Sequence, residues 1–385
     1  MKKDLYSNLI KSIPPSGIRK FFDLVIGCHD IISLGVGEPD FITPWHIREE
    51  AFYSLEKGKT SYSSNKGLLD LRKAVSNYLK EQYGCSYDPE NEILITVGVS
   101  EGIDLALRSI INPGDEFIVP EPCYVCYVPL GVIAQAKVVT IDTSKSNFEV
   151  LAKDIESKIT KKTKAVLLSY PNNPTGLTIK KEELEKILKV AKKHDILVIS
   201  DEIYSELSYD DSHYSFASLP GAKERTILLS GFSKGWAMTG WRIGYIAGPH
   251  ELIELATKIH QYSIICAPIT SQYAAITAIK NCREDIEKMR KSYLHRRNFL
   301  ADKLNNLGLK TIEPKGAFYV FPSIKTTGLK SEEFCIKLLN EERVAVVPGN
   351  VFGTCGEGFV RCAYSTSIDN IREAVTRIGN FINRL

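Results

Sequence analysis

The sequence reads Ser-Gly-Phe-Ser-Lys-Gly-Trp-Ala-Met-Thr-Gly-Trp-Arg-Ile-Gly from Ser230 to Gly244, directly after the apolar run Thr226–Leu229. The run predicts a buried strand, and the segment places Lys234 in a loop of small residues with Arg242 eight positions later. A lysine in such a loop can approach a flat cofactor and form a Schiff base, and an arginine can bind a phosphate with two parallel hydrogen bonds. A solvated surface lysine would explain neither the small residues nor the two tryptophans.

Short apolar runs alternate with amphipathic stretches over roughly residues 45–250. This alternation predicts an α/β fold with a mostly parallel sheet flanked by helices. Thr43 is expected to cap the first long helix, with Pro44 at its first position. The runs that we expect to form strands are Ile93–Val97, Glu116–Val119, Lys137–Thr140, Lys164–Leu168, Ile196–Ser200 and Thr226–Leu229.

The pattern changes after Glu251, where a largely helical stretch continues to Asn305 and is expected to break at Pro268. Short strands and two helices follow, with strands expected around 310–311, 318–321, 344–347 and 359–362. We therefore expect a large cofactor domain over residues 45–280 and a smaller α+β domain over residues 281–385. The N-terminal segment, residues 1–44, is expected to join the smaller domain, which is then built from both termini.

Composition excludes several classes of function. The 385 residues carry a net charge of +3, and no run of lysine or arginine exceeds two, so we expect no nucleic-acid partner. No apolar stretch has the length of a membrane span or signal peptide, so we expect a cytoplasmic protein without a membrane partner. Nine scattered cysteines do not form a disulfide framework. Cys123 and Cys126 are spaced like a metal or redox pair, but without a second pair we expect them to pack, and we expect no metal.

The segment Thr96–Gly102 predicts a strand that turns tightly into a helix. Such a helix N-terminus can bind phosphate through free backbone N–H groups, here those of Val99 and Ser100. The same letters also spell Gly-x-Ser-x-Gly, the nucleophile motif of α/β-hydrolases, with Ser100 as the nucleophile. A hydrolase would need a later histidine in a loop, and only His213 and His250 qualify.

Two further segments follow predicted strands at the sheet edge where open α/β sheets bind ligands. Ser169–Gly176 contains Asn-Asn-Pro-Thr-Gly, which alone predicts only a turn. Ser200–Tyr204 places Asp201 at the end of a strand, where it could also serve as a helix cap.

Taken together, these segments resemble the class I/II aminotransferases, which belong to the fold type I pyridoxal-phosphate enzymes. The resemblance runs from Ser33–Phe41 to Gly356–Arg361, and Gly231–Gly244 matches the lysine signature of the family at every specified position. Details around residues 61–67 look most like the aspartate and N-acetyl-diaminopimelate aminotransferases. The resemblance implies an enzyme that moves an amino group between an L-amino acid and a 2-oxo acid, with 2-oxoglutarate expected as the acceptor.

The resemblance also assigns roles to single residues. Lys234 would bind pyridoxal 5'-phosphate covalently and transfer protons, Asp201 would pair with the pyridine nitrogen, and Tyr204 would bind the phenolic oxygen. Arg361 would clamp the substrate carboxylate. Tyr62 would reach the phosphate in the neighbouring subunit of a homodimer. The remaining cofactor residues implied are Val99, Ser100, Tyr124, Asn173, Ser233 and Arg242, and the remaining substrate residues are Gly37 and Asn173.

Two positions depart from the family pattern. Gly231 stands where many relatives have a phosphate-binding serine, and Ser100 stands where several aspartate-specific relatives have a lysine. The second departure weakens an assignment to aspartate alone. A C–S β-lyase, which uses the same lysine and aspartate, stays open as an alternative, as does the α/β-hydrolase.

Overall fold

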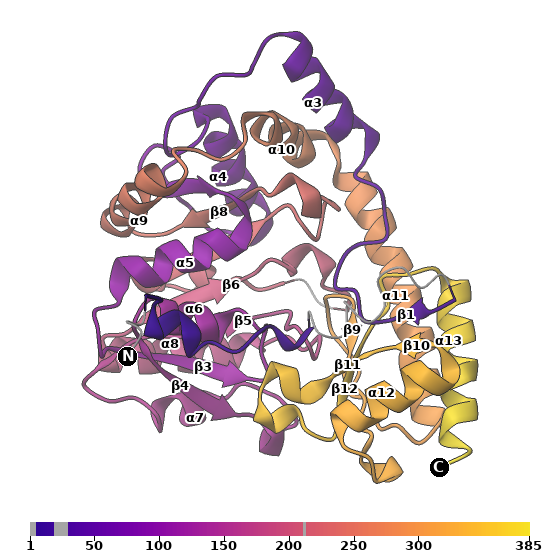
Figure 1. Ribbon diagram of the computed structural model, residues 1–385. Helices are drawn as coiled ribbons and strands as arrows, with labels where there is room; N and C mark the ends of the chain where they lie inside the picture. Colours follow the sequence, from indigo (N-terminus) through magenta and orange to yellow (C-terminus); the bar gives the residue numbers. More distant parts are fainter. Residues whose placement is uncertain (1–4, 19–29, 211–212) are drawn as a thin grey trace.

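The computed structural model describes residues 5–18, 30–210 and 213–385. Within these residues the main strands are Ile93–Thr96 (β2), Glu116–Glu121 (β3), Lys137–Asp142 (β4), Thr163–Ser169 (β5), Leu197–Asp201 (β6), Thr226–Gly231 (β7) and Gly244–Ala247 (β8). They form one sheet in the order β2-β8-β7-β6-β5-β3-β4 (Figure 1). Strand β8 is antiparallel to both neighbours and every other pair is parallel, which confirms the expected mostly parallel sheet.

Helices cover both faces of this sheet, and the strands are therefore apolar on both sides. In β2, Ile93 and Ile95 pack into one buried cluster, and Leu94 packs into another on the opposite face. The first face carries the helices Trp45–Glu56 (α3), Leu69–Tyr83 (α4), Ala152–Glu156 (α7), Lys181–His194 (α8) and Ile269–Asn281 (α10). The second face carries Gly98–Ile110 (α5), Tyr127–Ile133 (α6) and His250–Ser263 (α9).

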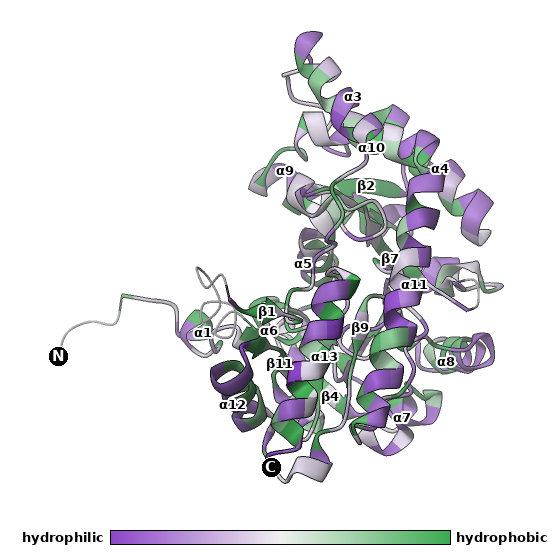
Figure 2. Ribbon diagram, turned by 90° about the vertical axis from the view of Figure 1, so that its right-hand side faces the viewer, coloured by the Kyte–Doolittle hydropathy of each residue, from purple (hydrophilic) through white to green (hydrophobic). Residues whose placement is uncertain are grey.

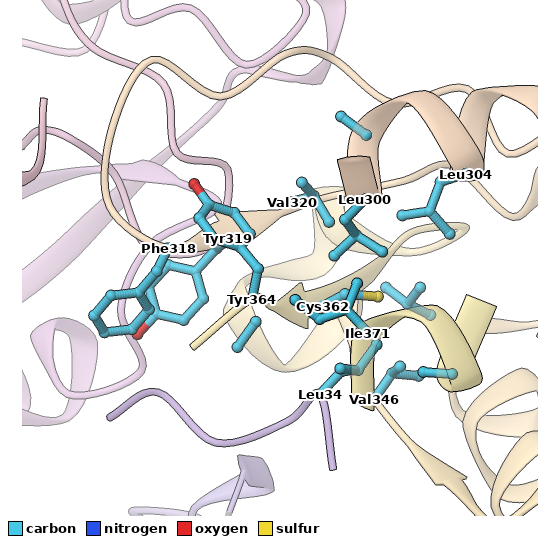
Figure 3. Close-up of a cluster of buried hydrophobic side chains, with 14 of the residues drawn as sticks. Leu34, Leu300, Leu304, Phe318, Tyr319, Val320, Val346, Cys362, Tyr364 and Ile371 are labelled. Atoms are coloured by element: carbon cyan, nitrogen blue, oxygen red, sulfur yellow. The ribbon is translucent and has the colours of Figure 1, made fainter. Parts of the chain in front are cut away.

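The C-terminal part of the chain builds two small sheets around a separate core. Strands Val347–Pro348 (β11), Val360–Ala363 (β12) and Tyr319–Val320 (β9) are antiparallel, and Ile32–Ser33 (β1) pairs in parallel with Val344–Ala345 (β10). The helices here are Arg283–Asn306 (α11), Ser331–Glu342 (α12) and Ile368–Ile382 (α13). Figure 3 shows residues from β9, β12, α11 and α13 meeting in the core, together with Leu34, which directly follows β1. The domain limits at residues 44 and 280 stay a prediction.

Local expectations were wrong at several points. No strand forms at Lys310–Thr311, and strand β8 was not expected. Thr43 does not cap α3, because its hydroxyl donates to the carbonyl oxygen of Ala237 at 2.6 Å and accepts from the Trp241 indole at 3.0 Å. The expected break of the helical stretch at Pro268 is confirmed, but a second break at Cys282 was not expected. The expected strand at 344–347 is two strands in two different sheets, because the chain changes partner at Val346.

Hydropathy follows this arrangement. Strand β2 is hydrophobic along its length, and helices such as α13 carry both hydrophilic and hydrophobic residues (Figure 2). In the described part of the chain, no helix combines the length and the apolar character that crossing a membrane requires.

Candidate functional site

A cavity of about 350 Å³ lies where strands β5, β6 and β7 end, at the carboxyl edge of the parallel strands. It collects residues from the large sheet and from the three-stranded small sheet, as well as from the loops between elements. Of the residues that sequence reasoning assigned to the site, the cavity is lined by Gly37, Val99, Ser100, Tyr124, Asn173, Asp201, Tyr204, Ser233, Lys234, Arg242 and Arg361.

Lys234 lies in the loop after β7 and is enclosed by the cavity wall. Its Nζ donates to the carbonyl oxygen of Gly37 at 2.7 Å. Burial lowers the pKa of Lys234 to about 8, and the cations Arg361 and Arg242 act in the same direction while Glu38 opposes them. A substantial fraction of this amine is therefore neutral at mildly alkaline pH, and a neutral amine can act as a nucleophile and as a base.

Asp201 is the last residue of β6 and is 3% exposed. One carboxylate oxygen accepts from the Tyr127 hydroxyl at 2.9 Å, and the other accepts from the Ile203 amide at 3.2 Å. Burial raises the pKa of Asp201 to about 6, although both hydrogen bonds oppose the rise. A cation placed in the cavity next to this carboxylate would stabilise its charged form.

An anion-binding cradle lies at the N-terminus of α5. Gly98 has a φ of +74°, and a Cβ at this position would lie 2.7 Å from Nη2 of Arg242. The glycine therefore lets the guanidinium approach the first turn, where Val99 and Ser100 line the cavity together with Ser233. Backbone N–H groups at a helix N-terminus and a guanidinium are the donors that bind phosphate best.

Gly231, which departs from the pattern that the resemblance implies, has no room for a side chain. It pairs directly with Gly244 across β7 and β8. A Cβ at Gly231 would lie 2.8 Å from Cα of Gly244 and 3.0 Å from the carbonyl oxygen of Ile243. A serine side chain would therefore require the two strands to move apart.

Arg361, on β12, is a buried cation. It donates to Asn173 Oδ1 at 2.9 Å and to the carbonyl oxygen of Gly35 at 2.6 Å, and its Nε has no partner. Its guanidinium lies against the Tyr319 and Phe352 rings, 4.5 and 4.9 Å from their centroids. Among the residues that the structure describes, no carboxylate is paired with it. Burying an arginine without an anion is unfavourable, so this side chain suits a carboxylate ligand.

Two groups of predicted residues lie elsewhere. The Tyr62 side chain is 78% exposed and is not part of the cavity formed by its own chain. The two histidines that a hydrolase would need do not line the cavity that Ser100 lines: His213 is paired with Glu202 at 2.7 Å, and His250 lies 3.4 Å from Glu254. The hydrolase alternative therefore has no support.

Sequence reasoning missed two tyrosines at this site. The Tyr127 hydroxyl binds Asp201, and the Tyr319 hydroxyl lies 2.8 Å from that of Tyr204. Tyr127 follows Tyr124 by three positions, the spacing of one helical turn, and this was the available signal. Nearby Cys123 packs in the core beneath α5 and α6, and burial raises the pKa of its thiol well above the usual range.

The cavity fits the cofactor that the resemblance implies. The cradle at Gly98 would hold a phosphate, Asp201 would face a protonated ring nitrogen, and Lys234 would reach an aldehyde. Asn173 and Tyr204 supply polar groups for a phenolic oxygen, and Tyr124 offers a ring for stacking. The donor set thus matches each chemical feature of pyridoxal phosphate.

Comparisons with known proteins agree with this geometry. The family model for aminotransferase class I and II matches residues 29–378. A Bacillus subtilis protein named putative aminotransferase YugH is 51% identical over 98% of both chains. The probable N-acetyl-LL-diaminopimelate aminotransferase of the same organism is 44% identical over 97% of this chain and 94% of its own.

A solved structure of aspartate aminotransferase from Thermus thermophilus with maleate superposes with a TM-score of 0.93 at 35% identity, covering 98% of this chain and 100% of that one. Each match extends over almost the whole chain, so it includes both the cavity and the elements that build it. The chain therefore belongs to the class I and II aminotransferases, enzymes that use pyridoxal phosphate to transfer amino groups between amino acids and 2-oxo acids.

Proposed function

We propose that Lys234, Asp201 and Tyr204 carry out the transamination and that 2-oxoglutarate is the amino acceptor. One observation carries the proposal: a lysine with a lowered pKa, a buried carboxylate and a buried arginine without a carboxylate partner meet in one cavity. When bound, pyridoxal phosphate supplies an aldehyde that joins amino groups and a ring that withdraws electrons from the substrate Cα.

The residues of this chain would then perform three tasks. The Lys234 amine takes the proton from the substrate Cα and returns a proton during the same half-reaction. The Asp201 carboxylate holds a proton on the ring nitrogen, so that the ring stays an effective electron acceptor. Arg361 binds the α-carboxylate and thereby orients the Cα–H bond toward Lys234.

The substrate range can be measured directly. A panel of L-amino acids is mixed singly with the loaded enzyme, and the loss of the cofactor absorbance is followed over one turnover. Donors are then paired with 2-oxoglutarate and with other 2-oxo acids. The proposal expects regeneration by 2-oxoglutarate. Pyruvate release from cystathionine without any 2-oxo acid would instead indicate the β-lyase.

Replacing Arg361 with lysine should raise the KM for amino acids and for 2-oxo acids alike, by about tenfold to a hundredfold, because both carry the same carboxylate and lysine cannot form the paired hydrogen bonds. Steady-state kinetics in both directions would measure this. Arg372→Lys, on the exposed side of α13, is the matched control and should change neither KM. A rise for only one of the two substrates would contradict a shared clamp.

We further propose that the active unit is a homodimer in which Tyr62 completes the neighbouring cavity. Large apolar side chains are exposed on α3, which projects at the top of Figure 1, and at the end of α9. Phe52 is 65% exposed and Tyr262 is 86% exposed. Such a surface is typical of an interface, and a two-fold axis would bring the same patch of a second copy against it.

A cytoplasmic location also stays a proposal, supported by eight described cysteines that are all free.

Subunit mixing tests the role of Tyr62 in the partner. The inactive variants Lys234→Ala and Tyr62→Asp are unfolded, refolded together and assayed. If Tyr62 serves the partner, each mixed dimer has one intact cavity, and because about half of the dimers are mixed, about a quarter of all cavities recover. If Tyr62 serves its own chain, confirmed mixed dimers stay inactive. Each variant refolded alone is the control.

A further inference from the structure

We propose that Tyr319 is a positioning residue that keeps the Tyr204 hydroxyl available as a hydrogen-bond donor toward the cofactor. This inference rests on the proposed function of Tyr204 and assigns a task to a residue outside the set discussed for catalysis. Tyr319 begins β9, and its side chain is 1% exposed, so its hydroxyl has fixed neighbours. Figure 3 shows its ring beside Phe318, with Tyr364 nearby.

The Tyr319 hydroxyl is enclosed between two parts of the cavity wall. Its oxygen lies 2.8 Å from the Tyr204 hydroxyl oxygen, a normal hydrogen-bond distance. On the other side is the backbone of Gly37, where a Cβ would lie 2.6 Å from the Tyr319 hydroxyl oxygen. The glycine therefore permits a close approach that any other residue would block.

Nearby charges decide which hydroxyl donates. The Arg361 guanidinium lies 4.5 Å from the Tyr319 ring centroid, and the Lys234 ammonium lies 5.9 Å from the Tyr204 ring centroid. Burial raises the pKa of both tyrosines, that of Tyr204 well above its usual value, and Arg361 opposes the rise in both. The Arg361 guanidinium packs against the Tyr319 ring, so Tyr319 is the stronger acid. Tyr124, also titratable, faces the same pair. The stronger acid is the better donor, so Tyr319 donates to Tyr204.

This direction has a consequence for the cofactor. Once the Tyr204 oxygen accepts from Tyr319, its own O–H group is left to point into the cavity. Hydrogen bonds in a chain polarise one another, which makes Tyr204 a stronger donor to the phenolic oxygen of the cofactor. A hydrogen bond to the phenolic oxygen stabilises the deprotonated form of the bound cofactor more than its protonated form. The bond therefore lowers the pKa of the bound cofactor.

The test is a pH titration of the absorbance of the bound cofactor. Tyr319→Phe removes the donor but keeps the ring against Arg361, so the titration midpoint should rise by about half a pH unit while the KM for amino acids stays unchanged. Tyr204→Phe should raise the midpoint at least as much. The double variant should match Tyr204→Phe alone, because Tyr319 acts only through Tyr204.

Tyr364→Phe is the matched control, because this buried tyrosine belongs to the same core and its hydroxyl donates to the Ala317 carbonyl oxygen at 3.2 Å. Its midpoint should equal that of the parent. A Tyr319→Phe midpoint equal to the parent, or a double variant whose midpoint lies above that of Tyr204→Phe, would overturn the role of Tyr319 alone. An unchanged midpoint in Tyr204→Phe would overturn the proposed role of Tyr204 and this inference with it.

Discussion

Replacing Lys234 with alanine is expected to reduce transamination by at least about 10⁴-fold while leaving a folded protein that still binds the cofactor. Lys234 is the amine in the cavity that can attach to the cofactor and move protons at the substrate Cα. The cradle around Gly98 and Arg242 is untouched by the substitution, so phosphate binding should persist. Activity assays, circular dichroism and cofactor binding by equilibrium dialysis would measure the three properties.

Borohydride reduction provides the complementary measurement on the parent protein. It should fix the cofactor to Lys234, as peptide mapping by mass spectrometry would show. Lys73→Ala, on the exposed side of α4, is the matched control and should retain both activity and labelling. Recovery of the label on any other lysine would reject the assignment.

Local sequence signals predicted the large sheet because its strands are unusually regular. Strands β2 and β7 are buried at every position, so each appears in the sequence as an apolar run bounded by turn residues. Strand β8 is equally buried, but it is only four residues long and begins with a glycine, and it was not predicted. The ligand edge followed from the same pattern, because Asp201 and the Lys234 loop both come directly after such runs.

Two of the misses have the same cause, because hydrogen bonds to residues distant in the sequence replace the local ones that the pattern predicts. The Thr43 hydroxyl has the chemistry of a helix cap, yet it binds a carbonyl group 194 positions later in the chain. The Tyr204–Tyr319 bond joins residues 115 positions apart, and no local pattern predicts it. The roles of the site residues, and above all the action of Tyr62 in a partner subunit, stay predictions that the experiments above address.

Replacing Asp201 with asparagine should change activity and stability in opposite directions. Activity should fall by at least about a hundredfold, since an amide cannot hold a proton on the ring nitrogen. The amide oxygen can still accept from the Ile203 N–H, but the amide Nδ2 cannot accept from the Tyr127 hydroxyl, which must turn and accept from it instead. The cofactor-free protein should become more stable at neutral pH. Its Asp201 pKa is raised by burial from 3.8 to about 6, so the charged carboxylate is disfavoured in the folded state.

The sign and the pH range of the stability effect follow from that pKa. The unfolding free energy of the cofactor-free parent falls as the pH rises from about 4 to 6, and it stays low above pH 6. For this shift in the pKa of Asp201 the loss is about 3 kcal/mol. The Asp201→Asn variant lacks this loss. Its unfolding free energy should therefore exceed that of the parent at pH 8, and the difference should shrink toward pH 4. Denaturant unfolding at both pH values measures it, with Asp195→Asn, whose side chain is 95% exposed, as the control. If the variant is no more stable than the parent at pH 8, Asp201 is not a carboxylate held ready for a cationic ring, and its place in the mechanism must be given up.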